Sequence, residues 1–184
     1  MENPADRMYI LFYLSLGNAG RIKAFNRIWK VYSGRIAFYI SQILPKGSYY
    51  ADDCFQEVML KIYQGLETFK IEYPVKPWLY AIARNHTLDY IQRKEYEEVE
   101  YFELITAADV TNPESGFVRS EIFSAIENSI NKLAEDDSQI AYLRFYEEMK
   151  LKDIADIMGI NINTVKTRIT SVKKILQNDL RGWL

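Results

Sequence analysis

The sequence predicts an all-α protein made of two small helical domains joined by an acidic linker. Almost every apolar stretch repeats at intervals of three and four residues, the period of a helix packed on one side, and no stretch keeps the period of two expected of a strand. Eight Gly and five Pro in 184 residues are too few for the frequent turns of an all-β chain. The composition, 48% hydrophobic and 26% charged, is that of a soluble globular chain able to bury a core.

Eight helices are expected, most of them bounded by Gly or Pro. They span residues 5–16, 20–44, 51–66, 76–95, 117–132, 137–148, 151–158 and 162–178. The first contains an apolar run, Tyr9–Leu16, that is too short to span a bilayer and is not followed by a signal-peptide cleavage site. It is therefore expected to begin a core helix.

The chain has one cysteine, Cys54, and one histidine, His86. A single cysteine excludes an intramolecular disulfide and a cysteine-based zinc site, which fits a reducing cytoplasm. His86 is expected only to pack. No metal site and no cofactor are predicted.

Charge is distributed unevenly along the chain. Residues 97–149 carry 13 acidic and 3 basic side chains, whereas residues 1–96 and 150–184 are both mildly basic, so the net charge of −2 hides two basic ends. The stretch from Tyr96 to Gly116 combines acidic residues with weak periodicity, which is typical of either a solvated helix end with a loop or a tether. Extended, about 20 residues reach ~66 Å, nearly two turns of B-DNA at ~34–36 Å each. We favour a domain at 1–95, a linker at 96–116 and a domain at 117–184.

The strongest local pattern is a helix-turn-helix at residues 151–178. A short apolar-faced helix ends at Gly159, where a sharp turn requires a residue that tolerates a left-handed conformation. Asn161 follows and is placed to cap the next helix. That helix has Val165, Ile169 and Val172 on one stripe.

The polar side of this second helix has the composition of a DNA-reading surface. Hydroxyl and amide side chains reach base edges in a major groove, and flanking cations meet phosphates. The alternative is an ordinary solvated helix face. The candidate DNA contacts are Asn163, Thr164, Lys166, Thr167, Arg168, Thr170, Ser171 and Lys174.

Residues 143–176 resemble region 4 of bacterial sigma factors. The resemblance is carried by Asp153-Ile154-Ala155 before the turn and by Thr164-Val165-Lys166-Thr167-Arg168 after it. The resemblance implies that this domain binds the −35 promoter element.

An earlier segment, Ala51-Asp52-Asp53-Cys54-Phe55-Gln56-Glu57-Val58, resembles region 2.2 of the same family. The resemblance implies docking on the β′ clamp helices of core RNA polymerase. The implied polymerase-facing residues are Asp53, Gln56, Glu57, Leu60, Lys61 and Gln64. Cys54 occupies a position that is usually aliphatic in the family, and it is expected to be a small buried hydrophobe.

Residues 77–94 mix aromatic and basic side chains, a composition that suits stacking on unpaired bases as well as a core helix with a basic rim. The motif Trp78-Leu79-Tyr80-x-Ile82-Ala83-x-Asn85 resembles regions 2.3 and 2.4 of the same family, which open and read the −10 element. The implied pocket for a flipped base includes the loop Phe69–Lys76. The implied −10 contacts are Lys76, Trp78, Tyr80, Arg84, Asn85 and Arg93.

The two halves occur in the family's order, which implies an extracytoplasmic-function sigma factor without catalysis. Its implied partners are core RNA polymerase, promoter DNA and an anti-sigma factor. The alternative is a helix-turn-helix regulator with a sensory N-terminal domain, but residues 1–95 show no βα alternation and no phospho-acceptor pattern. An all-helical hydrolase is a third class, and the sequence has no phosphate loop, metal cluster or nucleophile motif that would support it.

Overall fold

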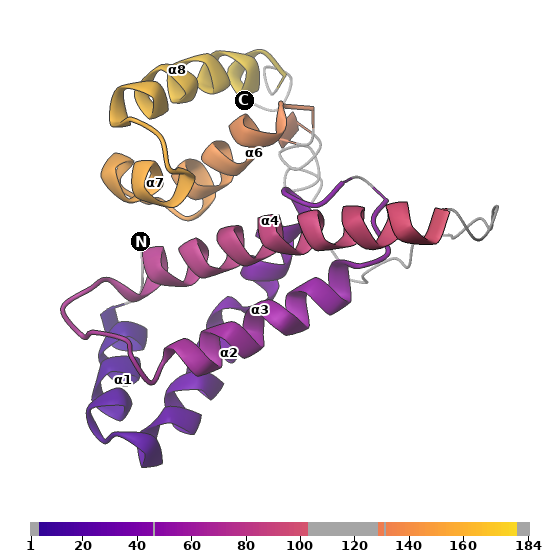
Figure 1. The fold of residues 1–184 in the computed structure, drawn as a ribbon. Coiled ribbons are helices and arrows are strands. Elements are labelled where there is room, and N and C mark those ends of the chain that lie inside the picture. The colour runs from indigo at the N-terminus through magenta and orange to yellow at the C-terminus, as the bar shows by residue number, and fades with distance from the viewer. Residues whose placement is uncertain (1–3, 46, 103–128, 131, 180–184) are drawn as a thin grey trace. The chain divides into compact units, whose positions relative to one another are not determined.

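The computed structural model describes residues 4–45, 47–102, 129–130 and 132–179. Every regular element within these ranges is a helix, which confirms the predicted fold class. The chain divides into two compact units, Glu2–Asn112 and Pro113–Leu184 (Figure 1). The first contains α1 (Pro4–Ser15), α2 (Asn18–Ser41), α3 (Ala51–Gly65) and α4 (Val75–Phe102). The second contains α6 (Glu135–Ala141), the π-helix η1 (Tyr142–Tyr146), α7 (Leu151–Met158) and α8 (Ile162–Asp179).

Two helix predictions differ from the structure or lie outside it. The helix expected to end at residue 95 continues to Phe102, into the range expected for the linker. The helix expected at 117–132 lies almost entirely outside the described residues, as do residues 103–116 of the expected linker. The domain boundaries at 95, 96–116 and 117 therefore stay a prediction.

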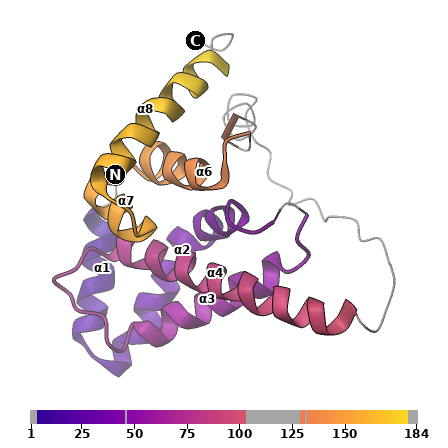
Figure 2. The ribbon, with the colours of Figure 1, turned by 45° about the horizontal axis from the view of Figure 1, so that its top comes forward.

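Helices α1 and α2 lie side by side in both ribbon views and approach closely at Gly20 (Figure 2). A Cβ on Gly20 would lie 1.8 Å from the Tyr13 carbonyl oxygen, so only glycine permits this contact. Ala24 and Ile28 of α2 are fully buried. The Asp6 carboxylate accepts two hydrogen bonds from Arg27 and ties the start of α1 to α2.

The outer side of α1 does not match its expected role as a core helix. Ile10 is fully buried, but Met8, Phe12 and Leu16 are exposed by 71%, 59% and 52%. The helix is apolar on nearly all sides, and α2 covers only one of them. The prediction of a core helix is therefore correct only for the side of α1 that carries Ile10.

Helices α2, α3 and α4 enclose the core of the first unit. Tyr32 and Ile36 of α2 and Val58 and Ile62 of α3 are buried, at most 1% exposed. Tyr39 of α2 meets Tyr80 of α4 edge to face, with ring centroids 5.1 Å apart. This contact fixes which side of α4 faces inward.

The second unit is built around a helix-turn-helix of α7 and α8, with α6 packed on α8. Ile140, Leu143, Ile154 and Val165 are fully buried and join the elements. Ile130, Ala141 and Val172 form a further buried cluster against which Leu133 and Leu176 pack.

The segment before the helix-turn-helix departs from the helix predicted for 137–148. Its second half is a π-helix, in which the Glu147 amide donates to the Tyr142 carbonyl at 3.0 Å, five residues back. Tyr142 and Tyr146 stack with ring centroids 4.9 Å apart. The chain then reverses at Glu148, whose φ is 54°.

Candidate promoter and polymerase interfaces

The turn between α7 and α8 has the geometry expected from its sequence. Gly159 adopts φ 67° and ψ 29°, the left-handed region that glycine enters without steric cost. Asn161 Oδ1 accepts a hydrogen bond from the Asn163 amide at 2.8 Å and caps α8. The start of α7 lacks a comparable cap, because the Lys150 side chain makes no capping hydrogen bond.

Helix α8 presents a polar side to solvent. Val165 and Val172 are fully buried, which fixes the rotation of the helix. Two threonines on the outer side bond back to the helix: Thr167 Oγ1 donates to the Asn163 carbonyl at 3.1 Å and Thr170 Oγ1 to the Lys166 carbonyl at 3.0 Å. The structure exposes seven of the eight predicted −35 contacts: Asn163, Thr164, Lys166, Thr167, Thr170, Ser171 and Lys174.

The eighth predicted contact, Arg168, has partners inside its own unit. Its guanidinium donates to Asp136 Oδ2 at 3.0 Å and lies 3.4 Å from Asp137 Oδ1, both at the start of α6. Only a third of the side chain is exposed. These ion pairs fix α8 on α6, and the phosphate contact of Arg168 stays a prediction.

Helix α3 carries the predicted polymerase-facing residues on its outer side. Cys54, Val58 and Ile62 are fully buried, so the opposite side faces outward. Leu60 is 55% exposed, which makes it a large apolar side chain in an otherwise polar surface. Five of the predicted residues are exposed and Glu57 is partly exposed: Asp53, Gln56, Glu57, Leu60, Lys61 and Gln64.

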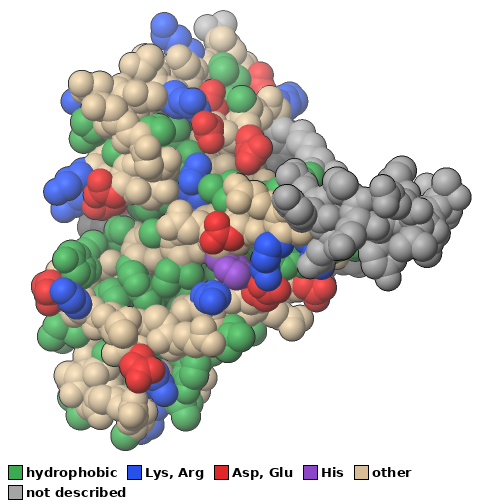
Figure 3. All heavy atoms as spheres, in the orientation of Figure 1, with side chains coloured by type: hydrophobic (Ala, Val, Ile, Leu, Met, Phe, Trp, Pro, Cys, Tyr) green, Lys and Arg blue, Asp and Glu red, His purple; other side chains and the backbone are tan. Residues whose placement is uncertain are grey.

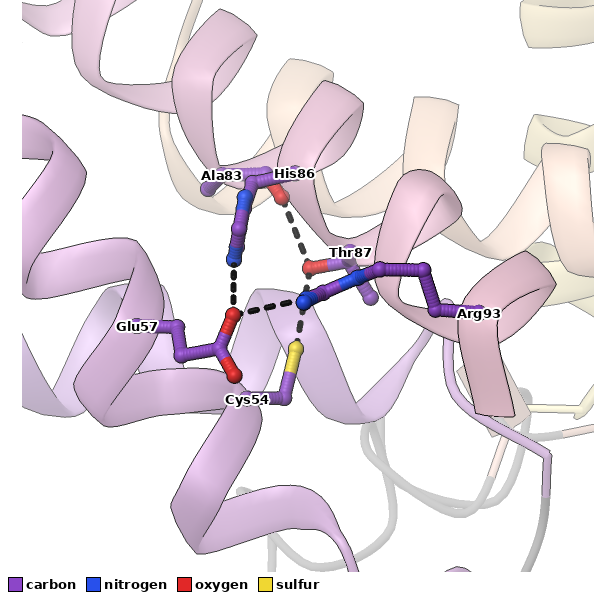
Figure 4. A network of polar contacts seen from close by, with 6 residues as sticks. All are labelled: Cys54, Glu57, Ala83, His86, Thr87 and Arg93. Atoms are coloured by element: carbon purple, nitrogen blue, oxygen red, sulfur yellow. Dashed lines mark hydrogen bonds and ion pairs between the residues drawn. The ribbon is translucent and has the colours of Figure 1, made fainter. Parts of the chain in front are cut away.

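Glu57 is the centre of a polar network between α3 and α4 (Figure 4). Its Oε2 atom accepts a hydrogen bond from Arg93 at 2.7 Å and lies 2.9 Å from His86 Nε2. Partial burial alone would raise the pKa of Glu57, but the hydrogen bonds and charges of Arg93 and His86 outweigh it and hold that pKa below its usual range. The carboxylate is thus kept ionised and fixed in position.

The sequence analysis missed this role of His86, which was expected only to pack. Its side chain is 12% exposed and meets a carboxylate 29 residues earlier in the chain. No local pattern signals such a pair. Beneath it, Cys54 is buried as expected; its thiol donates to Thr87 Oγ1 at 3.7 Å, and burial raises its pKa (Figure 4).

The N-terminal half of α4 exposes fewer of the predicted −10 contacts than expected. Trp78 is partly exposed and packs on Phe69, with ring centroids 4.7 Å apart. Tyr80 is fully buried against Tyr39, and Lys76 is 5% exposed. Both side chains are buried, so neither lies on the described surface, and their predicted −10 contacts stay predictions. Arg84 is partly exposed and Asn85 is exposed.

The loop before α4 has an apolar surface. Ile71 and Tyr73 are 53% and 56% exposed. Figure 3 shows hydrophobic side chains gathered over this loop and the beginning of α4. The pocket expected between residues 69 and 76 stays a prediction.

A cluster of aromatic and basic side chains, also missed from the sequence, joins the α2–α3 loop to α4. Tyr50 lies 6.2 Å from Tyr90 between ring centroids. The Lys94 ammonium lies 5.2 Å and 5.8 Å from these two rings, and Arg93 lies 5.3 Å from Tyr90. These cation–π contacts anchor the loop and orient both cations.

The described part of the chain has neither a metal-binding cluster nor a membrane-spanning helix. No group of three or more His, Cys, Asp or Glu there could hold a metal ion. None of the described helices combines the length and apolar character needed to cross a bilayer.

Two protein families match the chain, in the order of its two units. The family described as Sigma-70 region 2 matches residues 28–96, and Sigma-70 region 4 matches residues 123–176. The first match covers the part of the chain that the alternative reading assigned to a sensory domain, so that alternative is not favoured.

Curated relatives and solved structures agree with these matches. The chain is 33% identical to the ECF RNA polymerase sigma factor SigW of Bacillus subtilis, over 71% of this chain and 75% of SigW. It is 28% identical to the ECF RNA polymerase sigma-E factor of Escherichia coli K12, over 88% and 89% of the two chains.

Among solved structures, the sigma factor RpoE from Bartonella quintana, in complex with the anti-sigma factor NepR, has a similar fold. It gives a TM-score of 0.65 at 20% identity, over 86% of this chain and 98% of that one. CnrH, in complex with the cytosolic domain of CnrY, gives 0.59 at 19% identity, over 97% and 98%. With its two matched sigma regions and its 33% identity to SigW, the chain belongs to the ECF sigma factors of RNA polymerase.

Proposed function

We propose that the two units divide promoter recognition between them, with the first binding core polymerase and the −10 element and the second binding the −35 element. The observation that carries the proposal is the outer side of α8, whose hydroxyl, amide and lysine side chains are exposed beyond a capped helix-turn-helix. A helix of this kind inserts into a major groove, where its side chains read base edges.

The first unit supplies two further surfaces in this proposal. The outer side of α3, around Glu57 and the exposed Leu60, docks on the β′ clamp helices. The apolar loop around Ile71 and Tyr73, with Trp78 and Asn85 of α4, receives unpaired −10 bases. Flipping a base costs a few kcal/mol, and stacking at ~1–3 kcal/mol per base offsets it. The work of opening DNA thus comes from binding, without catalysis.

The test is run-off transcription with core polymerase from the source bacterium and fragments of its genome. The full chain is expected to direct initiation from discrete start sites, which core alone does not use. A mobility shift with and without core is the accompanying measurement, because a regulator would bind duplex DNA without core. Failure to support specific initiation on any fragment would refute the proposal.

We also expect an anti-sigma factor as a partner and the cytoplasm, where RNA polymerase acts, as the location. RpoE, one of the structures of similar fold, was solved with the anti-sigma factor NepR, and CnrH, another, with the cytosolic domain of CnrY. Co-expression with the product of the neighbouring gene, followed by run-off transcription, tests the partnership. Stable complex formation that blocks initiation is the expected result, and unchanged initiation would contradict it.

A further inference from the structure

Arg93 has two candidate roles, one in DNA contact and one in polymerase docking. It was predicted as a −10 contact, yet its guanidinium donates to Glu57 of the polymerase-facing helix at 2.7 Å. The same guanidinium lies 5.3 Å from the Tyr90 ring, so Glu57 and Tyr90 both help to orient it. Figure 4 shows Arg93 and His86 reaching from α4 toward Glu57 on α3.

From this geometry we infer that Arg93 is a positioning residue for polymerase docking, acting through Glu57. The inference rests on the proposed function, because it takes α3 as the docking surface. The Glu57 side chain is 41% exposed, so it can reach a partner while one of its oxygens is held from behind. A free glutamate would lose rotamer freedom on docking, whereas a carboxylate fixed beforehand does not.

The inference also specifies the chemistry of the partner surface at this point. Arg93 and His86 both approach Oε2, and the carboxyl is held ionised. A carboxylate accepts hydrogen bonds at both of its oxygens. The complementary group on core polymerase is therefore a cation, lysine or arginine, that meets Glu57 from the solvent side.

A double-mutant cycle on the affinity of the full chain for core polymerase tests this role. Arg93→Gln is expected to weaken core binding about fivefold, the order of an ion pair with a charge-assisted hydrogen bond. In a Glu57→Gln background the same change is expected to have almost no effect, because the carboxylate that Arg93 positions is gone. Arg93→Lys, which keeps the charge and one donor, is expected to restore most of the affinity.

The matched control is Lys94→Gln, which removes the same charge from the neighbouring residue. Its ammonium lies over the Tyr50 and Tyr90 rings, so core affinity is expected to stay within twofold of the unchanged chain. Thermal unfolding of Arg93→Gln serves as the folding control, because the Arg93 side chain is 54% exposed and its loss should not unfold the unit.

A second readout separates positioning from DNA contact. Holoenzyme formed at saturating chain concentration is challenged with a promoter fragment found by run-off transcription. Unchanged retention of the fragment by Arg93→Gln holoenzyme supports the inference. Loss of retention with full core affinity would make Arg93 a DNA contact and overturn it, as would additive losses in the cycle. A wild-type chain that does not bind core would overturn the proposed function as well.

Discussion

The close approach of α1 and α2 at Gly20 predicts that two Gly→Ala changes in one helix will have opposite effects on stability. At Gly20 the added Cβ would lie 1.8 Å from the Tyr13 carbonyl oxygen and 2.7 Å from its carbon. At Gly34, also in α2, an added Cβ meets nothing within 4 Å. Both changes replace glycine by alanine in α2, Gly20 in its first turn and Gly34 in its interior, so the steric contact is the main difference between them.

The magnitude follows from the geometry. Ordinary contact begins near 3.4 Å, so the α1 backbone must move by about 1.6 Å to admit the Gly20→Ala methyl group. Overpacking of this kind costs about 1–3 kcal/mol, against a propensity gain of about 0.8–1 kcal/mol. We expect Gly20→Ala to destabilise the first unit by up to about 2 kcal/mol and Gly34→Ala to stabilise it by about 0.5–1 kcal/mol.

Urea unfolding followed by tryptophan fluorescence measures both effects, because Trp29 and Trp78 lie in this unit. The midpoint should fall for Gly20→Ala and rise for Gly34→Ala at unchanged slope. Equal stabilisation by both changes would refute the reasoning, since it would mean that α1 gives way at no cost.

Four further outcomes are expected. Thr167→Ala and Lys174→Ala should each weaken the binding of −35 DNA by up to about 3 kcal/mol while leaving the affinity for core polymerase intact. Equal loss of DNA binding and of core affinity would contradict the assignment of the α8 surface. Glu57→Lys should release the chain from core polymerase in co-purification without unfolding it, although loss of the Arg93 and His86 contacts should lower its melting temperature; retained binding would remove Glu57 from the interface. Asn161→Ala should destabilise the second unit by about 0.5–2 kcal/mol in thermal unfolding, because it removes the α8 cap. Cys54 should resist a thiol reagent until the unit unfolds, since it is fully buried and burial raises its pKa; rapid labelling of the native chain would show that the core opens there.

The helix-turn-helix could be predicted because its signals are local. A glycine at the turn, an asparagine two residues later and an apolar stripe each act within one or two helical turns. Side-chain identity alone therefore placed the buried and exposed sides of α8. Arg168 was the exception, because its partners Asp136 and Asp137 lie about 30 residues earlier and only the packing of α6 on α8 brings them together.

The inward-facing side of α4 was harder to predict, because aromatic and basic residues lie on all sides of this helix. Trp78 and Tyr80 are two residues apart and so point about 200° from each other. Both cannot face the same DNA strand, and composition does not say which one turns inward. The structure decides it through Tyr39 of α2, which packs on Tyr80. The Glu57–His86 pair had the same difficulty, since it depends on how α3 meets α4.

The exposed charges on α8 predict that the second unit alone would hold DNA only weakly. Of the four cations in α8, Arg168 is engaged by Asp136 and Asp137, which leaves Lys166, Lys173 and Lys174 exposed. At most three phosphate contacts, counting Lys173 beside the two predicted lysine contacts, correspond to a salt dependence of about −3 in log K against log[salt], at ~0.9 per contact. Proteins that hold DNA by themselves with 6–10 contacts reach roughly two to three times that slope. A second attachment through core polymerase raises the effective concentration of α8 at its site, so a weak module suffices when both units act on the same promoter.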